Sequence, residues 1–359
     1  MNTNFLDRID EYIRQKRYRL INSVLVYENG ELAFERYYNN RNAQSRNQIK
    51  SVWKSVLSLT LGVCVDKGWI GGVDEPIGRY LPEFALNIYP YHKSITIRHL
   101  LTMSSGIYWS GGVHYHCPML DQMRRSQEWV EHIAEVRPAY YPGTKFVYKE
   151  WDVILLSALI GRAYSMAHTS AGSVQSASNH GLTLSSAENL APMPRGDCAS
   201  AALDSPNGKS SDVPFKGSDA FSAWDVCSEY IYKPLGISSE RWTRSNCGVD
   251  YPSWGDDVTS DLSARDMAKI GLLMLNGGVR EGRRIVSEEY VKAGVAPSAA
   301  NSGYGFLWWL SGAGFHAQGF GGQELNVYPA QNAVAVIQAT VTPSSKTYSD
   351  VCENILTLL

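Results

Sequence analysis

Ser51 and Lys54 form the only Ser-x-x-Lys pattern in this 359-residue chain, and together they offer a nucleophile and a base. A serine hydroxyl attacks poorly until a base takes its proton, and a lysine can be that base if burial lowers its pKa. The apolar stretch at 51–67 predicts a helix that begins at the serine, which puts residues i and i+3 on one face. Free N–H groups at such a helix start favour developing negative charge. On the pattern alone, an N-cap serine beside a solvated lysine is the favoured alternative.

An ordered series of further motifs follows this pair along the chain. They are GWI at 68–70, DEPI at 74–77, YLP at 80–82, ITIRHLLTMSSG at 95–106, PGTKFVY at 142–148, YKPLGI at 232–237, SARDMAKIG at 263–271 and GFGGQ at 319–323. The series resembles the class C β-lactamase-like serine hydrolases, in the β-lactamase and penicillin-binding-protein superfamily. That family includes D-alanyl-D-alanine peptidases, esterases and 6-aminohexanoate-dimer hydrolases. The resemblance covers nearly the whole chain except residues 165–219.

The second motif of the family, Tyr-x-Asn, corresponds here to Tyr148-Lys149-Glu150. The resemblance implies that Tyr148 is a second base, which relays a proton between Ser51, Lys54 and the leaving group. A nearby ammonium group would stabilise the phenolate. Glu150 replaces the Asn that binds an amide of the substrate in relatives. An ionised Glu accepts hydrogen bonds but donates none, so we expect Glu150 to change substrate binding.

The third motif of the family, Lys-Thr-Gly or His-x-Gly on a strand, aligns with Ala317-Gln318-Gly319, which we assign to substrate binding. The lysine that would bind a substrate carboxylate is therefore missing. His316 comes one position earlier. Alternation along a strand puts His316 on the opposite face from Ala317, so we expect a structural role for it.

Backbone and aromatic groups complete the candidate site. By resemblance, the N–H groups of Ser51 and Phe320 form the oxyanion hole, where removing one donor typically costs about 10²–10³ in rate. Gly319 permits close approach of the backbone to a substrate. Trp109 and Trp309 are candidates for the wall of the substrate cleft, with core packing an equal alternative.

Hydrophobic periodicity indicates the elements that position these residues. Helices are predicted at 5–13, 51–67, 97–103, 127–161 with a break at 138–143, 221–233, 262–275 and 348–359. Strand-like runs at 20–27 and 32–38 flank Asn29-Gly30, a strong hairpin signal. Further strands are predicted at 306–310, 324–328 and 333–340.

The predicted fold class is α+β, with an antiparallel sheet built from both termini, flanked by helices, and an inserted, mostly helical domain, as in β-lactamases and transpeptidases. Residues 1–60 and 260–359 are expected to form the sheet domain, and residues 61–259 the helical one. Residues 165–214 contain no Phe, Trp or Tyr. Because such a segment buries little apolar surface, we predict a flexible insertion at 165–219, outside the packed core.

Composition narrows the class of protein. The formal net charge is -2, which disfavours nucleic acid or an anionic membrane as a partner. Ten Trp and 21 Tyr disfavour a largely disordered chain.

No apolar run is long enough to span a membrane, and the first residues lack a secretory signal, so we expect a cytoplasmic protein. The scattered cysteines predict reduced thiols. His114, His116 and Cys117 have no matching second cluster, so we expect no metal site.

These observations predict a serine hydrolase that forms an acyl-enzyme on Ser51, with no metal or organic cofactor. The missing lysine and the Glu at position 150 favour small esters or amides as substrates, with β-lactams and D-alanyl-D-alanine peptides as the alternative. Two other classes stay open. One is a binding or sensor protein that has lost turnover, and the other is a structural protein that associates through residues 165–219.

Overall fold

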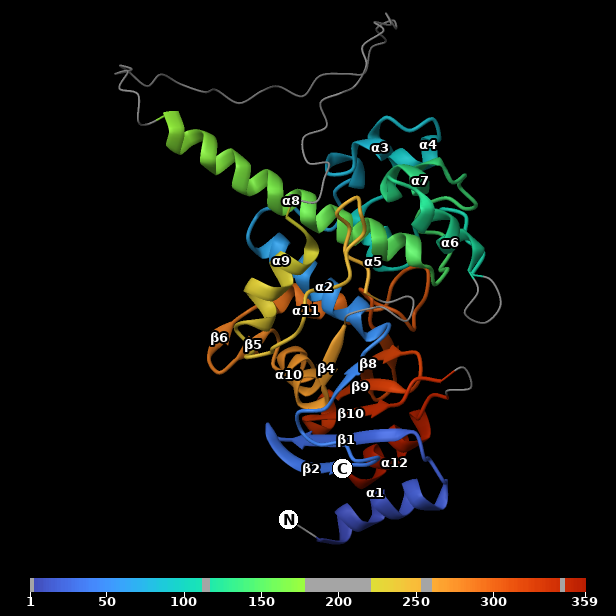
Figure 1. Cartoon of the computed structure of the whole chain (residues 1–359), viewed down its shortest axis with the longest axis vertical. Helices are drawn as coiled ribbons and strands as arrows, with labels where there is room; N and C mark the ends of the chain where they lie inside the picture. The colour runs from blue at the N-terminus through green and yellow to red at the C-terminus, as the bar shows by residue number, and fades with distance from the viewer. Residues whose placement is uncertain (1–2, 112–116, 178–220, 253–259, 343–345) are drawn as a thin grey trace, which may run out of the picture.

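An antiparallel sheet drawn from both ends of the chain is the base of the fold (Figure 1). The computed structural model describes residues 3–111, 117–177, 221–252, 260–342 and 346–359. The six strands of the sheet lie in the order β2-β1-β10-β9-β8-β7. Their bounds are β1 Ile21–Glu28, β2 Glu31–Tyr37, β7 Trp309–Ser311, β8 Gly314–Gly319, β9 Gln323–Tyr328 and β10 Ala333–Ala339. All five neighbouring pairs run antiparallel, which confirms the predicted α+β class.

The predicted hairpin at Asn29-Gly30 joins β1 to β2. Both turn residues have positive φ angles, 53° at Asn29 and 81° at Gly30. A two-residue turn of this kind twists in the same sense as the strands that it joins, which is why the Asn-Gly dipeptide marks it in a sequence.

Helices cover both faces of the sheet. Helices α1 (Thr3–Gln15) and α12 (Ser349–Leu358) pack on one face through an apolar cluster that includes Ile13, Val26 and Ile355. Helix α10 (Ala264–Leu275) lies against the middle strands on the other face, and α2 (Val52–Asp66) contacts β8 and β9 there. Helix α2, which begins just after the nucleophile candidate Ser51, lies on the side of the sheet that faces the other helices (Figure 1).

The helical layer is built around α2, which is buried on all sides from Val52 to Cys64. A helix that is apolar all round belongs in the interior. It contacts α8 (Glu150–Ala177), α9 (Ala223–Cys227) and α11 (Glu288–Gly294). The remaining α-helices are α3 Pro82–Ala85, α4 Pro90–Lys93, α5 Ile97–Leu101, α6 Pro118–Arg125 and α7 Trp129–Glu135.

Several elements differ from the sequence-based expectation. Helix α8 continues through residue 177, so the insertion predicted at 165–219 begins as helix, with Ser165 buried. The rings of Tyr164 and His168 there pack on Trp69, at 4.7 and 5.4 Å between centroids. The strand expected at 306–310 is shorter, because β7 covers only Trp309–Ser311. Residues 228–232 form a π-helical turn after α9.

Five cysteines within the described residues, Cys64, Cys117, Cys227, Cys247 and Cys352, are free thiols, as predicted, and Cys198 lies outside them. His114 and His116 also lie outside the described residues. The part of the chain that the structure describes contains no cluster of three potential metal ligands. None of its helices is long and apolar enough to cross a membrane.

Candidate active site

A tight turn places Ser51 at the start of α2. Strands β3 (Arg46–Gln48) and β4 (Asp261–Ser263) pair just before this turn. Lys50 then adopts a left-handed conformation with φ of 50°, a strained geometry for a non-glycine residue. The Ser51 side chain makes no capping hydrogen bond. Its hydroxyl instead accepts one from Lys54 Nζ at 3.0 Å, so the alternative of an N-cap serine beside a solvated lysine does not hold.

Lys54 is buried, with 1% of the residue exposed, and bridges two oxygen atoms. Its Nζ lies 3.0 Å from Ser51 Oγ and 2.9 Å from Glu150 Oε1. Burial lowers the pKa of Lys54, but the charge of Glu150 and the contact with Tyr148 outweigh it and raise the pKa above its usual value. From the sequence, burial was expected to lower the pKa of Lys54 toward neutrality. The carboxylate of Glu150 is the reason that this pKa is raised instead.

Tyr148 lies beside the Ser51–Lys54 pair, just before α8 begins. Lys54 Nζ is 5.2 Å from the centroid of its ring. Trp309 stacks on the same ring, with centroids 5.8 Å apart and planes 19° apart, and Tyr304 meets it edge-on at 6.5 Å. The structure thus brings together four of the predicted residues, Ser51, Lys54, Tyr148 and Trp309, with Glu150 as a fifth.

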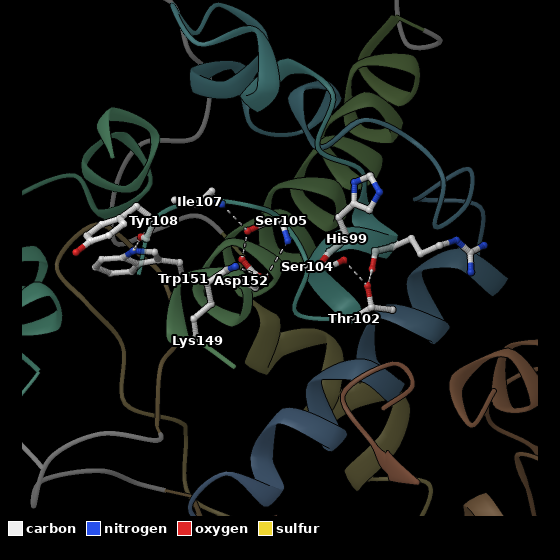
Figure 2. A network of polar contacts seen from close by, with 10 residues as sticks. His99, Thr102, Ser104, Ser105, Ile107, Tyr108, Lys149, Trp151 and Asp152 are labelled. Carbon is white, nitrogen blue, oxygen red and sulfur yellow. Dashed lines mark hydrogen bonds and ion pairs between the residues drawn. The ribbon is translucent and has the colours of Figure 1, made fainter. Parts of the chain in front are cut away.

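A second, fully buried polar network anchors the 148–150 segment from behind (Figure 2). Lys149 Nζ lies 3.5 Å from Asp152 Oδ2, and neither side chain is exposed to solvent. Ser105 donates from its hydroxyl to Asp152 Oδ1 at 2.6 Å. Burial raises the pKa of Asp152 to about 6, although the Lys149 charge and the Ser105 hydrogen bonds oppose this. Lys149 thus points into this network, whereas its chain neighbours Tyr148 and Glu150 contact Lys54.

Strand β8 ends against the turn that carries Ser51. A Cβ atom added to Gly319 would lie 2.2 Å from the carbonyl oxygen of Ile49, so only glycine fits there. The next residue, Phe320, has 39% of its surface exposed. This close approach agrees with the family arrangement of the oxyanion hole. The hole itself, formed by the N–H groups of Ser51 and Phe320, stays a prediction.

The two faces of β8 have separate roles. Ala317 is buried in the apolar cluster that includes α2. His316 pairs in register with Asn326 of β9, whose side chain donates to Cys352 of α12 at 3.0 Å. Directly opposite residues share a face, so His316 points to the α12 side, away from Ser51. The predicted alternation is confirmed, and burial lowers the pKa of His316. Gln318 donates to Glu324 at 3.1 Å on the same face.

Trp109 packs edge-on against Trp151, with ring centroids 4.9 Å apart. This contact belongs to the interior of the helical layer rather than to the Tyr148–Trp309 stack. Its assignment as a substrate-binding residue stays a prediction.

Tyr251 is a site residue that sequence reasoning missed. Its ring packs edge-on against Trp53 of α2 at 6.0 Å. Its hydroxyl is buried. Burial and then the Glu150 charge raise its pKa well above the usual value, which places the hydroxyl near that carboxylate. No local pattern marks Tyr251, because the side chains of Trp53 and Glu150 that surround it are about one hundred or more residues away along the chain.

Comparison with known proteins shows which fold this chain shares. Residues 9–172 match the family model described as Beta-lactamase. No curated protein matches the chain significantly. A crystal structure of a putative β-lactamase from Bacteroides dorei is 17% identical, covers 98% of this chain and 97% of its own, and superposes with a TM-score of 0.66.

Two further solved structures are similar. A penicillin-binding protein from Bacillus halodurans is 15% identical over 98% of this chain and 100% of its own, with a TM-score of 0.64. EstCE1, described as a hydrolase with promiscuous acyltransferase activity, is 13% identical over 99% of this chain and 97% of its own, also with a TM-score of 0.64. Residues 9–172 therefore match the β-lactamase family model, and the chain has the β-lactamase-like fold. At these identities the likeness establishes the fold, and the reaction must be argued from the site.

Proposed function

We propose that this protein is a serine hydrolase that forms an acyl-enzyme on Ser51 and acts on small carboxylic esters or amides. The observation that carries the proposal is the continuous line from Ser51 Oγ through Lys54 Nζ to Glu150 Oε1, with steps of 3.0 and 2.9 Å. A nucleophile, a base and a third group that orients the base make up the arrangement that activates a hydroxyl for acyl transfer.

The raised pKa of Lys54 determines how the proton leaves Ser51. A lysine that is already an ammonium ion accepts a proton only if it gives one up at the same time. We therefore assign a relay in which Ser51 passes its proton to Lys54 Nζ while Lys54 passes one to Glu150 Oε1. The Ser51 oxygen then attacks the substrate carbonyl, and Tyr148 protonates the leaving group. Water then attacks the acyl group: the Tyr148 phenolate takes a proton from this water, and Glu150 returns its proton through Lys54 to the departing Ser51 oxygen.

The substrate assignment follows from two departures from the family pattern. Ala317 occupies the place of the carboxylate-binding lysine, and Glu150 occupies the place of the amide-binding Asn. Glu150 Oε1 is engaged by Lys54, so binding of the substrate by this residue would fall to Oε2. Both changes favour ester or simple amide substrates over β-lactams and D-alanyl-D-alanine peptides. EstCE1, with the same fold, is described as a hydrolase with acyltransferase activity.

The test is a substrate panel of p-nitrophenyl esters, a chromogenic cephalosporin and a D-Ala-D-Ala peptide, assayed with wild type and Ser51→Ala. Ser94→Ala is the matched control, because that hydroxyl bonds only to the Tyr91 carbonyl at the surface. We expect ester turnover by wild type and Ser94→Ala, and none above background by Ser51→Ala. Preferential turnover of the cephalosporin would favour the β-lactamase alternative. No turnover of any substrate would favour a silent binding protein.

A further inference from the structure

Lys149 and Asp152 form a wholly buried ion pair at the start of α8, next to the proposed catalytic residues (Figure 2). Lys149 Nζ lies 3.5 Å from Asp152 Oδ2, and neither side chain is exposed. Lys149 stands between Tyr148 and Glu150 in the chain, so the pair holds the backbone that carries both of them. Two apolar side chains of similar volume usually stabilise a fold as well as such a pair does. The position of the pair therefore points to a role beyond stability.

Hydrogen bonds to the loop at 103–108 hold the segment around Tyr148 and Glu150 from both sides. Val147 N donates to the Met103 carbonyl at 2.9 Å, Ser105 Oγ donates to Asp152 Oδ1 at 2.6 Å, and Trp151 Nε1 donates to the Tyr108 carbonyl at 3.2 Å. The first of these bonds precedes Tyr148 in the chain, and the other two follow Glu150. Asp152 is the point at which the loop and Lys149 meet (Figure 2).

The loop at 103–108 is itself tightly packed. Gly106 has a φ of 78°, and a Cβ atom added there would lie 2.2 Å from the Tyr140 carbonyl oxygen. Just before the loop, the Leu101 carbonyl accepts from Leu307 N at 2.9 Å, which joins the loop to the chain that leads into β7. The loop is therefore a firm support, and contacts with it limit the movement of the segment attached to it.

Asp152 keeps all of its contacts only when it is ionised. Its Oδ2 faces Lys149 Nζ and the Ser105 N–H, each at 3.5 Å, and both of these groups can only donate hydrogen bonds. A proton on Oδ2 would find no acceptor there, and the charge that attracts Lys149 would be lost. Burial raises the pKa of Asp152 to about 6, because the Lys149 charge and the Ser105 hydrogen bonds only partly oppose it. Lys149 is the charged group beside Asp152, and Tyr304 is a titratable group that the Asp152 charge also reaches.

We propose that Asp152 is a positioning residue: in its ionised form it holds Lys149, and with it the backbone that places Tyr148 and Glu150 against Lys54. The inference rests on the proposed hydrolase function and adds a control of the same site by pH. Asp152 is fully buried and touches none of the reacting atoms. When it takes up a proton, the ion pair with Lys149 is lost, and kcat should fall because small displacements of catalytic groups slow a reaction strongly.

The test is the pH profile of kcat for a p-nitrophenyl ester, measured with wild type, Asp152→Asn and Ser105→Ala. In wild type, kcat should decrease as the pH falls through about 6. Asp152→Asn should lack this step, with kcat about 10²-fold lower above it and KM unchanged. Ser105→Ala removes a hydrogen bond that lowers the pKa of Asp152, so its step should lie at higher pH. A merely structural role would change the melting temperature without moving the step.

Asp250→Asn is the matched control. Asp250 is also buried, with a pKa that burial raises to about 6, but its Oδ2 accepts from Trp224 N at 2.7 Å, outside the Asp152 network. We expect Asp250→Asn to keep the wild-type step in kcat. Asp152→Asn leaves Lys149 buried without its charged partner and can fail to fold for that reason. The double variant Lys149→Met with Asp152→Asn contains no unpaired charge there, so it should fold and show the same loss of kcat.

The outcomes separate this inference from the hydrolase itself. Wild-type kcat in Asp152→Asn or in the folded double variant would overturn the inference and leave the hydrolase intact. The same conclusion would follow from a wild-type profile without the step, from a step that Ser105→Ala does not move, or from one that Asp250→Asn removes. Absence of ester turnover by wild type at every pH would reject the hydrolase and the inference together.

Discussion

Lys54 Nζ and Glu150 Oε1 form a buried ion pair at 2.9 Å, and the same nitrogen donates to the Ser51 hydroxyl. Glu150 aligns with the Asn of the family motif that the sequence resembles, so the lysine of the proposed relay has a carboxylate partner. Burial lowers the pKa of Lys54, but the charge of Glu150 outweighs it and raises that pKa. In the proposed relay, a proton that enters at Ser51 leaves at Glu150. The predictions below test this line and the elements that position it.

Glu150→Gln removes the acceptor at the end of the relay and should lower kcat/KM for p-nitrophenyl esters by about 10²-fold. Without the negative charge, Lys54 loses its proton at a lower pH, so the high-pH limb of the kcat/KM profile should also move to lower pH. Glu131→Gln, at an exposed carboxylate of α7, is the control and should change neither quantity. A rise in activity near neutral pH on Glu150→Gln would show that Lys54 works as a free base and would contradict the relay.

Tyr148→Phe keeps the stack on Trp309 and removes only the hydroxyl that we propose protonates the leaving group. We expect kcat to fall by about 10²–10³-fold, with the melting temperature unchanged because the ring still packs. The exposed Tyr141 supplies the control substitution, Tyr141→Phe. Full activity of Tyr148→Phe would remove Tyr148 from the mechanism.

Gly319→Ala places a methyl group 2.2 Å from the Ile49 carbonyl, directly behind the turn that carries Ser51. We expect a loss of about 1–3 kcal/mol in the free energy of unfolding, because the backbone must shift. A fall of about 10²-fold in kcat/KM should accompany it as the oxyanion donors move. Gly312→Ala meets no atom within 4 Å and should leave both quantities unchanged. Equal behaviour of the two variants would mean that β8 does not position the site.

The Asn29-Gly30 hairpin and the buried helix α2 could be predicted because each has a local signal, a turn dipeptide and a continuous apolar stretch. Strand β8 could be predicted only from the family motif. Its residues from Gly314 to Gly319 include small and polar ones, so they give no clear hydrophobic alternation. Helix α8 extends past its expected end because Tyr164 and His168 find aromatic partners that no local window contains.

The catalytic candidates Ser51, Lys54 and Tyr148 could be predicted from motifs, but their electrostatics could not. The pairing of Lys54 with Glu150 joins residues 96 positions apart, and a sequence shows neither the distance nor the sign of the resulting pKa change. Tyr251 could not be predicted for the same reason, because the residues around its ring lie far away along the chain.

Glu324 gives a prediction for stability against pH. Burial on β9 raises its pKa to about 7 from an ordinary value of 4.5. Between these values the folded protein holds a proton that the unfolded chain has released, so this group's contribution to stability decreases as the pH rises from about 4.5 to about 7. Glu324→Gln should remove this part of the slope in denaturation experiments at a series of pH values. An identical slope in wild type and Glu324→Gln would contradict the assignment.

The central claim, acylation of Ser51, is tested most directly by mass spectrometry of the protein after reaction with a fluorophosphonate or a quenched p-nitrophenyl ester. We predict a covalent adduct on the peptide that contains Ser51 in wild type and no adduct in Ser51→Ala. An adduct on another residue, or ester turnover by Ser51→Ala at the wild-type rate, would contradict it.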